Sequence, residues 1–406
     1  MRPFFLRQII LDPLTNQAPV LELATSFLLL EDGGYLLLPD RISKLIIDID
    51  NVAATESDDA FFYLTEDGKG LYIVDKADPA TLMRGVNFGN LFWPLGTGGP
   101  NGTDYLKTPV TDADYIKLVA AGIDHVRLPL SPSVLFINEP NYTIFDNSVI
   151  QLVDKFIADA TRFGLSIIVD VHPRSFEYTD VYNGIAQIWF MLATRYKDFP
   201  KNVVFELLNE PNPDVFTNAG MYKSWHVNAY NAIRKIDPNR RIIIDSQYSG
   251  YPTGFNNITP LFDKNTTYSF HYYNPFSFSH QGATFQIPSG LLNNVAYPTN
   301  PDDIDAQYEN VAPNSNPPER SIQFNRKFIR DEIANNPVAW ADRYGIPRNR
   351  LYCGELGVYD QSTPHPDRQY WYRDVISALN ELGVGYCLWT YTGDFPTGPE
   401  ILQEIK

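Results

Sequence analysis

The sequence predicts an α/β fold, a (β/α)8 barrel with a small β-hairpin appendage at its N-terminus. Eight short apolar segments between residues 82 and 391 alternate with segments of helical periodicity, and eight is the strand count of a closed barrel. Polar and ionisable residues follow most of these segments, at the end of the strands where a barrel keeps its functional site. A doubly wound open sheet is the structural alternative. It usually carries a glycine-rich phosphate turn, and the sequence has no GxGxxG motif.

The eight expected strands are short and mostly apolar, as suits a sheet that is covered on both faces. They are LMRGVNF (82–88), DHVRLPL (124–130), LSIIVDV (165–171), NVVFELL (202–208), RIIID (241–245), TTYSFHYY (266–273), LYCGELG (351–357) and GYCLWTY (385–391). Helices are expected between them. The clearest are TDADYIKLVAAG, which opens with a Thr-x-x-Asp cap, SVIQLVDKFIADATRFG, which ends in glycine, and GMYKSWHVNAYNAIRKI.

One connection, from about residue 274 to residue 320, is unusually long. It is rich in Pro, Asn, Ser and Gly and shows no helical pattern, so we expect a loop there. Long loops in a compact domain are usually functional, and this one follows the sixth strand at the face expected to hold the site.

The first 80 residues have a different pattern. The segments FLLLEDGGYLLL and FFYLTEDGKGLYIV each place Asp-Gly between two apolar runs, which favours a β-hairpin. We therefore expect residues 1–80 to form a β-rich appendage and residues 81–406 to form the barrel.

Composition excludes several classes of partner. The net charge is −16 and no run of Lys or Arg forms a basic stripe, so nucleic acid and anionic membranes are not expected partners. No segment reaches the roughly 20 apolar residues of a membrane span. The start, MRPFFLRQIILDPL, resembles a signal peptide only faintly, because Arg7 and Asp12 interrupt the apolar run. We expect a monomer that is either cytoplasmic or a mature secreted chain.

The residues at the strand ends form the candidate site. They are Arg127, His172, Asn209 with Glu210, His271 with Tyr273, Glu355 and Trp389. Glycoside hydrolysis uses a pair of carboxyl groups, and here two glutamates are expected at one barrel mouth beside an arginine, a tyrosine and two histidines. The pair also suits other acid/base reactions. One carboxyl would be a protonated acid, and hydrogen-bond donors would keep the other ionised. The histidines are dispersed without an HExxH grouping, so we expect no metal and no cofactor.

Seven segments in order, MRGVNFGN, AGIDHVRLPL, GLSIIVDVH, NVVFELLNEPN, HYYNPFSFSHQG, CGELGVY and YCLWTY, resemble the signature segments of glycoside hydrolase family 5, the cellulase-type retaining enzymes of clan A. The resemblance implies that Glu210 is the acid/base and Glu355 the nucleophile. It implies that Asn209 holds the sugar 2-hydroxyl, and that Arg127 and Tyr273 hydrogen-bond Glu355.

The resemblance also implies a set of substrate-binding residues around the pair. Besides Arg127, Asn209 and Tyr273, they are His172, His271, His280, Trp389 and Asn90. From its place in the first loop, Trp93 is expected either to stack on a sugar or to close the barrel. The resemblance implies a cis peptide after Trp389. Pro173 departs from the family pattern, in which many relatives have a second histidine. Apart from the resemblance, the steric effect of Pro211 on the residue before it predicts an extended backbone at Glu210.

We therefore expect a retaining endo-β-1,4-glucanase that acts on a polysaccharide by double displacement, with the two carboxyl groups roughly 5 Å apart. A mannanase, xyloglucanase or mixed-linkage glucanase with the same mechanism stays open, as does a sugar-binding barrel without turnover. Cys353 and Cys387 face the barrel interior on adjacent strands by alternation, as two buried thiols or as a disulfide.

Overall fold

The computed structural model describes residues 82–89, 91–92, 109–261, 263–359, 363, 365–391, 393–397 and 401–402, and seven short strands before residue 76. Two compact units divide the chain, one of residues 1–77 with 162–164, the other of residues 78–161 with 165–406. Asn90 and Trp93 lie outside the described residues.

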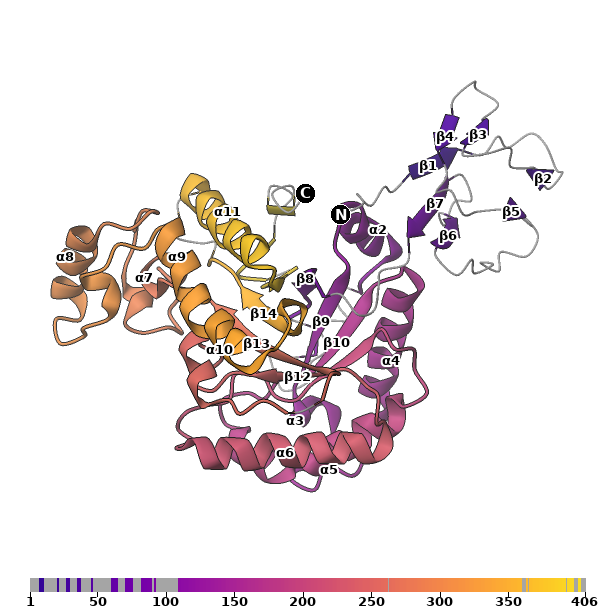
Figure 1. Ribbon diagram of the computed structural model, residues 1–406, viewed down its shortest axis with the longest axis horizontal. Helices are drawn as coiled ribbons and strands as arrows, with labels where there is room; N and C mark the ends of the chain where they lie inside the picture. The colour runs from indigo at the N-terminus through magenta and orange to yellow at the C-terminus, as the bar shows by residue number, and fades with distance from the viewer. Residues whose placement is uncertain are drawn as a thin grey trace. The chain divides into compact units, whose positions relative to one another are not determined.

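Eight parallel strands close into a barrel at the centre of the second unit, in the order β10-β11-β12-β13-β14-β15-β8-β9 (Figure 1). The strands are β8 (Arg84–Asn87), β9 (His125–Leu130), β10 (Ser166–Val171), β11 (Val203–Glu206), β12 (Ile242–Asp245), β13 (Thr266–Tyr272), β14 (Leu351–Leu356) and β15 (Gly385–Leu388). Each expected strand segment contains one of them. The predicted barrel is confirmed, and a closed barrel excludes the open sheet.

The barrel interior is built in layers, because alternate residues of a strand point to the same side. One layer is an apolar cluster that includes Ile168, Val204 and Ile243. Two residues further along the same three strands stand Asp170, Glu206 and Asp245, all buried. The apolar layer therefore supports a layer of acids directly below the mouth. Cys387 belongs to the apolar cluster, and both cysteines are buried free thiols.

Helices surround the barrel, and α5 and α6 lie side by side on its outside (Figure 1). The α-helices are α2 (Asp112–Ala120), α3 (Pro132–Leu135), α4 (Asn147–Arg162), α5 (Tyr178–Tyr196), α6 (Ala219–Ile236), α7 (Phe276–Ser279), α8 (Pro301–Val311), α9 (Arg326–Ile333), α10 (Ala339–Tyr344) and α11 (His365–Leu382). Short turns are η1 (Pro252–Asn257), η2 (Ser289–Leu291), η3 (Pro318–Arg320), η5 (Arg348–Arg350) and the π-helical η4 (Ala334–Val338). The predicted capping box of α2 is present, with Thr111 and Asp114 as its two members. Between β12 and β13, the described residues (246–261 and 263–265) contain the short turn η1 and no α-helix.

The expectation of a helix-free connection over residues 274–320 is wrong. Helix α8 lies within it, and the Asn300 side chain caps α8 by accepting a hydrogen bond from the Asp302 N–H at 3.2 Å. The signal was an N-cap asparagine followed by Pro301 and two acids, which together favour a helix start. Pro and Asn in the surrounding sequence concealed it.

The first unit contains the two expected hairpins. Antiparallel pairs join β3 (Phe27–Leu29) to β4 (Tyr35–Leu37) and β6 (Ala60–Leu64) to β7 (Gly70–Asp75). Strand β1 (Arg7–Ile10) pairs with β7, and β2 (Val20–Leu21) pairs with β5 (Leu45–Ile46). Among the described residues, no helix is both long and apolar enough to span a membrane.

We predict that Ile243→Ala lowers the free energy of unfolding by about 2–5 kcal/mol, because it opens a cavity beneath the layer of acids. Urea unfolding followed by fluorescence would show a lower midpoint with an unchanged slope. Ile137→Ala is the control, since that side chain is 65% exposed, and should change stability by less than about 0.5 kcal/mol. Equal effects of the two changes would contradict the layered core.

Candidate active site

The two glutamates stand at the mouth of the barrel on different strands. Glu355 belongs to β14, and Glu210 lies just beyond the end of β11. A carboxylate oxygen of each and a ring nitrogen of His271 all lie within 4.8 Å of one another. Oxygens this close agree with the carboxyl separation of roughly 5–5.5 Å at which one carboxyl forms a covalent intermediate, whereas a separation of roughly 6.5–9.5 Å leaves room for a water between them.

Glu355 is surrounded by hydrogen-bond donors. Its Oε1 accepts from Arg127 Nη1 at 2.7 Å and its Oε2 accepts from the Tyr273 hydroxyl at 2.8 Å. Burial raises the pKa of Glu355 above its ordinary value, although His271, Arg127 and the Tyr273 hydroxyl act to lower it. The expectation that donors bring this pKa down is therefore wrong in its net direction, because desolvation outweighs them.

Glu210 has a different environment. Its Oε1 lies 2.9 Å from His271 Nδ1, and its side chain keeps 32% exposure. Desolvation by the surrounding walls raises the pKa of Glu210 to about 7, and Arg127 lowers it only in part. Burial lowers the pKa of His271 to about 4, so a neutral imidazole faces this carboxyl at neutral pH. Of the two glutamates, Glu210 is thus the one suited to carry a proton.

The expected extended backbone of Glu210 is also wrong. Its φ is +45°, in the left-handed region that few non-glycine residues adopt. A proline disfavours the right-handed helical region for the residue before it, but local sterics alone did not decide the conformation here. Contacts from other strands, described below, hold it.

Arg127 lies beneath the glutamates with zero exposure, and it does not line the cleft. It was expected among the substrate-binding residues, and the structure instead makes it the centre of a buried network. Its nitrogens contact Glu206 Oε2 and Oε1 at 2.7 and 2.9 Å, Asn87 Oδ1 at 2.9 Å, Glu355 Oε1 at 2.7 Å, Asn209 Oδ1 at 2.8 Å and Asp170 Oδ2 at 2.9 Å.

Sequence reasoning missed three acids of this network, Asp170, Glu206 and Asp245. Asp170 Oδ2 lies 2.7 Å from His172 Nδ1 and so fixes that ring, while Asp245 Oδ2 accepts from the Glu210 N–H at 3.1 Å. The available signal was an acid inside each apolar strand, on the side that alternation turns toward the barrel axis.

Eight of the predicted residues line one cleft of about 480 Å³. They are His172, Asn209, Glu210, His271, Tyr273, His280, Glu355 and Trp389. Trp389 stacks on His172 with ring centres 5.8 Å apart, and its peptide bond to Thr390 is cis, as predicted. Tyr178, Tyr251, Phe276 and Phe285 also line the cleft and were not predicted.

The model of the cellulase family, glycosyl hydrolase family 5, matches residues 88–394. The chain belongs to glycosyl hydrolase family 5. It is therefore a glycoside hydrolase, as the segments of its sequence predicted.

Individual relatives agree with this assignment. Endoglucanase C of Acetivibrio thermocellus is 27% identical over 305 residues, which cover 71% of this chain and 85% of that protein. Cellodextrinase A of Ruminococcus flavefaciens is 26% identical over 340 residues, 78% of this chain and 88% of that one. The structure of endoglucanase Cel5A from Thermotoga maritima superposes with a TM-score of 0.66 at 22% identity, over 81% of this chain and all of that one.

Within the described part of the chain, two groups of side chains could each offer three ligand atoms to a metal ion. They are Glu206 with Asp245 and His271, and Glu210 with His271 and Glu355. Arg127 already holds Glu206 and Glu355 through direct ion pairs, so a cation would compete with a buried guanidinium. We assign neither group to a metal.

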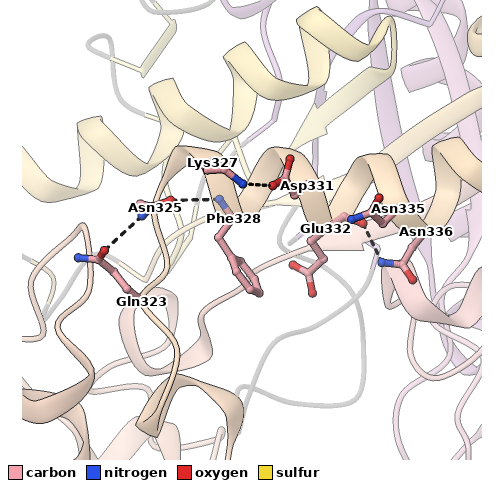
Figure 2. A pocket seen from close by; sticks show the side chains of 8 residues that line it. All are labelled: Gln323, Asn325, Lys327, Phe328, Asp331, Glu332, Asn335 and Asn336. Atoms are coloured by element: carbon pink, nitrogen blue, oxygen red, sulfur yellow. Dashed lines mark hydrogen bonds and ion pairs between the residues drawn. The ribbon is translucent and has the colours of Figure 1, made fainter.

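A second pocket, of about 490 Å³, lies along α9 and η4 (Figure 2). Phe328 and Glu332 point from the same side of α9, and amide side chains surround them (Figure 2). The Glu332 carboxylate accepts from the Tyr272 hydroxyl at 2.8 Å and from Asn274 Nδ2 at 3.0 Å. This pocket shares no lining residue with the cleft. Glu332 connects it to Tyr272 and Asn274, the two residues that flank Tyr273.

We predict that Arg127→Met lowers the free energy of unfolding by about 3–5 kcal/mol near neutral pH, because several buried carboxylates lose their counter-charge. The guanidinium holds the pKa of Glu206 below its ordinary value against the effect of burial, so this stabilisation is lost as pH falls through that pKa. Urea unfolding at about pH 7 and about pH 3.5 should show a smaller difference from the native chain at the lower pH.

Arg326→Met is the control, because Arg326 pairs with Glu381 at the surface and is 45% exposed. Its effect should stay below about 1 kcal/mol at both pH values. If the loss in the free energy of unfolding caused by Arg127→Met is as large at about pH 3.5 as at about pH 7, Arg127 stabilises the fold by packing rather than by its charge.

Proposed function

We propose that the chain is a retaining endo-β-1,4-glucanase in which Glu355 is the nucleophile and Glu210 the acid/base. The observation that carries the proposal is the pair itself, with carboxylate oxygens within 4.8 Å and opposite hydrogen-bond environments. Two donors, one of them a guanidinium, hold the Glu355 carboxylate, while Glu210 faces a neutral imidazole.

In the first step, Glu355 attacks the anomeric carbon and the bond to the glycosidic oxygen breaks. Glu210 gives its proton to that oxygen, which leaves as the hydroxyl of the released chain. In the second step, Glu210, now a carboxylate, takes a proton from water as the water attacks the anomeric carbon. Glu355 then leaves as a free carboxylate.

Neighbouring side chains position the sugar. Arg127 holds Asn209 Oδ1 at 2.8 Å, which leaves the Nδ2 group to donate to the 2-hydroxyl. His172 and Trp389 form a stacked floor, and Tyr251, Phe276 and Phe285 supply aromatic surface further along the cleft. His271 and His280 line the same cleft. Asn90 stays a proposal from the resemblance, and Trp93 stays a proposal from its place in the first loop.

The relatives' names favour β-1,4-glucan as the substrate, since several of them are endoglucanases. A second candidate is β-1,4-mannan, because structures of the similar Thermotoga maritima barrel are described in complex with cellobiose and with mannotriose. We propose that this chain acts as a secreted monomer, since a polymeric substrate is met outside the cell.

We predict that the chain releases reducing ends from carboxymethyl cellulose and barley β-glucan, and that Glu355→Gln removes this activity, because an amide cannot attack the anomeric carbon. A panel that also holds xyloglucan, glucomannan, galactomannan and xylan would identify the substrate. Glu381→Gln, at the surface, is the matched control and should keep full activity. Proton NMR of the first products should show the β-anomer. An α-anomer first would contradict retention.

We predict that kcat/KM falls about tenfold per pH unit above about pH 7, because Glu210 must be protonated for the first step and burial raises its pKa to about 7. Initial rates on a cello-oligosaccharide between pH 4 and pH 10 would show this alkaline limb. The limb should vanish in Glu210→Ala assayed on an activated aryl cellobioside, whose leaving group requires no proton. A limb that persists there would belong to another residue.

A further inference from the structure

The backbone of Glu210 is held in an unusual conformation from both sides. Its φ of +45° is costly for a residue with a side chain and persists only where the surroundings impose it. The Glu210 N–H donates to Asp245 Oδ2 at 3.1 Å, and the Glu210 carbonyl accepts from the Tyr178 hydroxyl at 3.1 Å. The peptide groups on both sides of this residue are thus fixed by side chains from other parts of the barrel.

Asp245, the last residue of β12, also approaches the Glu210 carboxyl through His271. Its Oδ2 lies 3.6 Å from His271 Nε2, and His271 Nδ1 lies 2.9 Å from Glu210 Oε1. The Asp245 side chain has zero exposure and does not line the cleft. It can therefore act on a substrate only through the residues that it holds.

The turn after Asp245 continues this support. Tyr248, Ser249 and Gly250 are three consecutive residues with positive φ, at 62°, 55° and 75°. The Ser249 N–H donates to the Pro211 carbonyl at 3.1 Å, and the Gly250 carbonyl accepts from the His271 N–H at 2.7 Å. A Cβ on Gly250 would stand 3.1 Å from His271 Cγ, so the turn packs directly on the imidazole.

We propose that Asp245 is a positioning residue for the acid/base of this hydrolase, and that it acts by holding the left-handed backbone of Glu210 and the ring of His271. The inference rests on the proposed function, since it takes Glu210 to be the acid/base. The fifth strand, which contributes no side chain to the predicted site, thereby contributes to catalysis. Its contribution should fall on proton transfer, because it accepts a hydrogen bond from the Glu210 N–H, and His271 Nδ1 is hydrogen-bonded to Glu210 Oε1 at 2.9 Å but lies 3.6 Å from Glu355 Oε2.

The test compares two substrates that differ in their demand for a proton. The leaving group of a cello-oligosaccharide is a sugar hydroxyl, which requires a proton from Glu210. The leaving group of dinitrophenyl β-cellobioside is a stable dinitrophenolate, which requires none. The value of kcat/KM reports the steps up to cleavage of the first bond, so the later role of Glu210 as a base does not enter. A misplaced acid should slow the first substrate alone.

We predict that Asp245→Leu lowers kcat/KM on the oligosaccharide at least about a hundredfold, the lower range of general acid catalysis, and changes kcat/KM on the dinitrophenyl substrate less than about fivefold. Asp245→Asn keeps an oxygen that can accept from the Glu210 N–H, and should recover most of the lost rate. Equal losses on both substrates would overturn the proposal and leave Asp245 a structural residue.

Two controls separate the possible failures. Asp170→Asn changes another buried acid of the same layer, one that holds His172 and Arg127, and should slow both substrates in parallel. Glu210→Ala must itself show the selective loss. If it does not, the proposed role of Glu210 fails, and this inference fails with it. If Glu210→Ala is selective and Asp245→Leu is not, only the inference fails.

A second variant keeps the proposal testable if Asp245→Leu does not fold. Tyr178→Phe removes only the hydroxyl that donates to the carbonyls of Asn209 and Glu210, at 3.2 and 3.1 Å. This variant should lower kcat/KM on the oligosaccharide about tenfold and leave the dinitrophenyl substrate nearly unchanged, because one such hydrogen bond is worth about that factor. Parallel losses on the two substrates would again count against positioning of the acid.

Discussion

The buried guanidinium of Arg127 is the group on which the site depends. A charge inside a barrel is costly unless it is paired and hydrogen-bonded, and Arg127 meets both conditions through contacts from four other strands or their ends. Each contact fixes its partner in one orientation. Glu355 receives a donor on one oxygen, Asn209 is left with its amide nitrogen toward the cleft, and Asp170 is set to hold His172. The geometry of the mouth is thus determined one layer below it.

That single cation also sets the charge balance of the layer. Asp170, Glu206 and Glu355 contact it directly, and Asp245 lies close by. One guanidinium cannot neutralise four buried carboxyls. Burial therefore raises the pKa values of Asp170 and Asp245 well above the ordinary range, while the two-pronged contact with Arg127 keeps the pKa of Glu206 low. Glu355 lies directly above this layer, and burial raises its pKa as well, which favours the proposed role in which its charge is neutralised by a bond to the anomeric carbon.

The sequence predicted the barrel and the residues at its mouth for a physical reason. Parallel strands end at the same face, so residues that follow apolar runs must gather there. Glu210, Glu355 and His271 were found in this way. Asp170, Glu206 and Asp245 were not, because the apolar strands show that both faces are covered but not which face points to the barrel axis. Only the closed sheet shows that these three acids face the axis in one layer near Arg127. Helix α8 was missed because its cap, Asn300, stands among residues typical of loops.

The backbone of Glu210 shows why a local rule failed at the site itself. Its conformation costs on the order of 1–3 kcal/mol, and the side chains and backbone that impose it, from Asp245, Tyr178 and Ser249, are distant in sequence. In a continuing strand, alternation would place residue 210 on the same side as Glu206, toward Arg127. The chain leaves that alternation after β11 ends, since Asn209 also contacts Arg127, and Glu210 contacts His271 instead. Of the two glutamates it is therefore the one that has no direct contact with Arg127, and its raised pKa agrees with the acid role proposed for it.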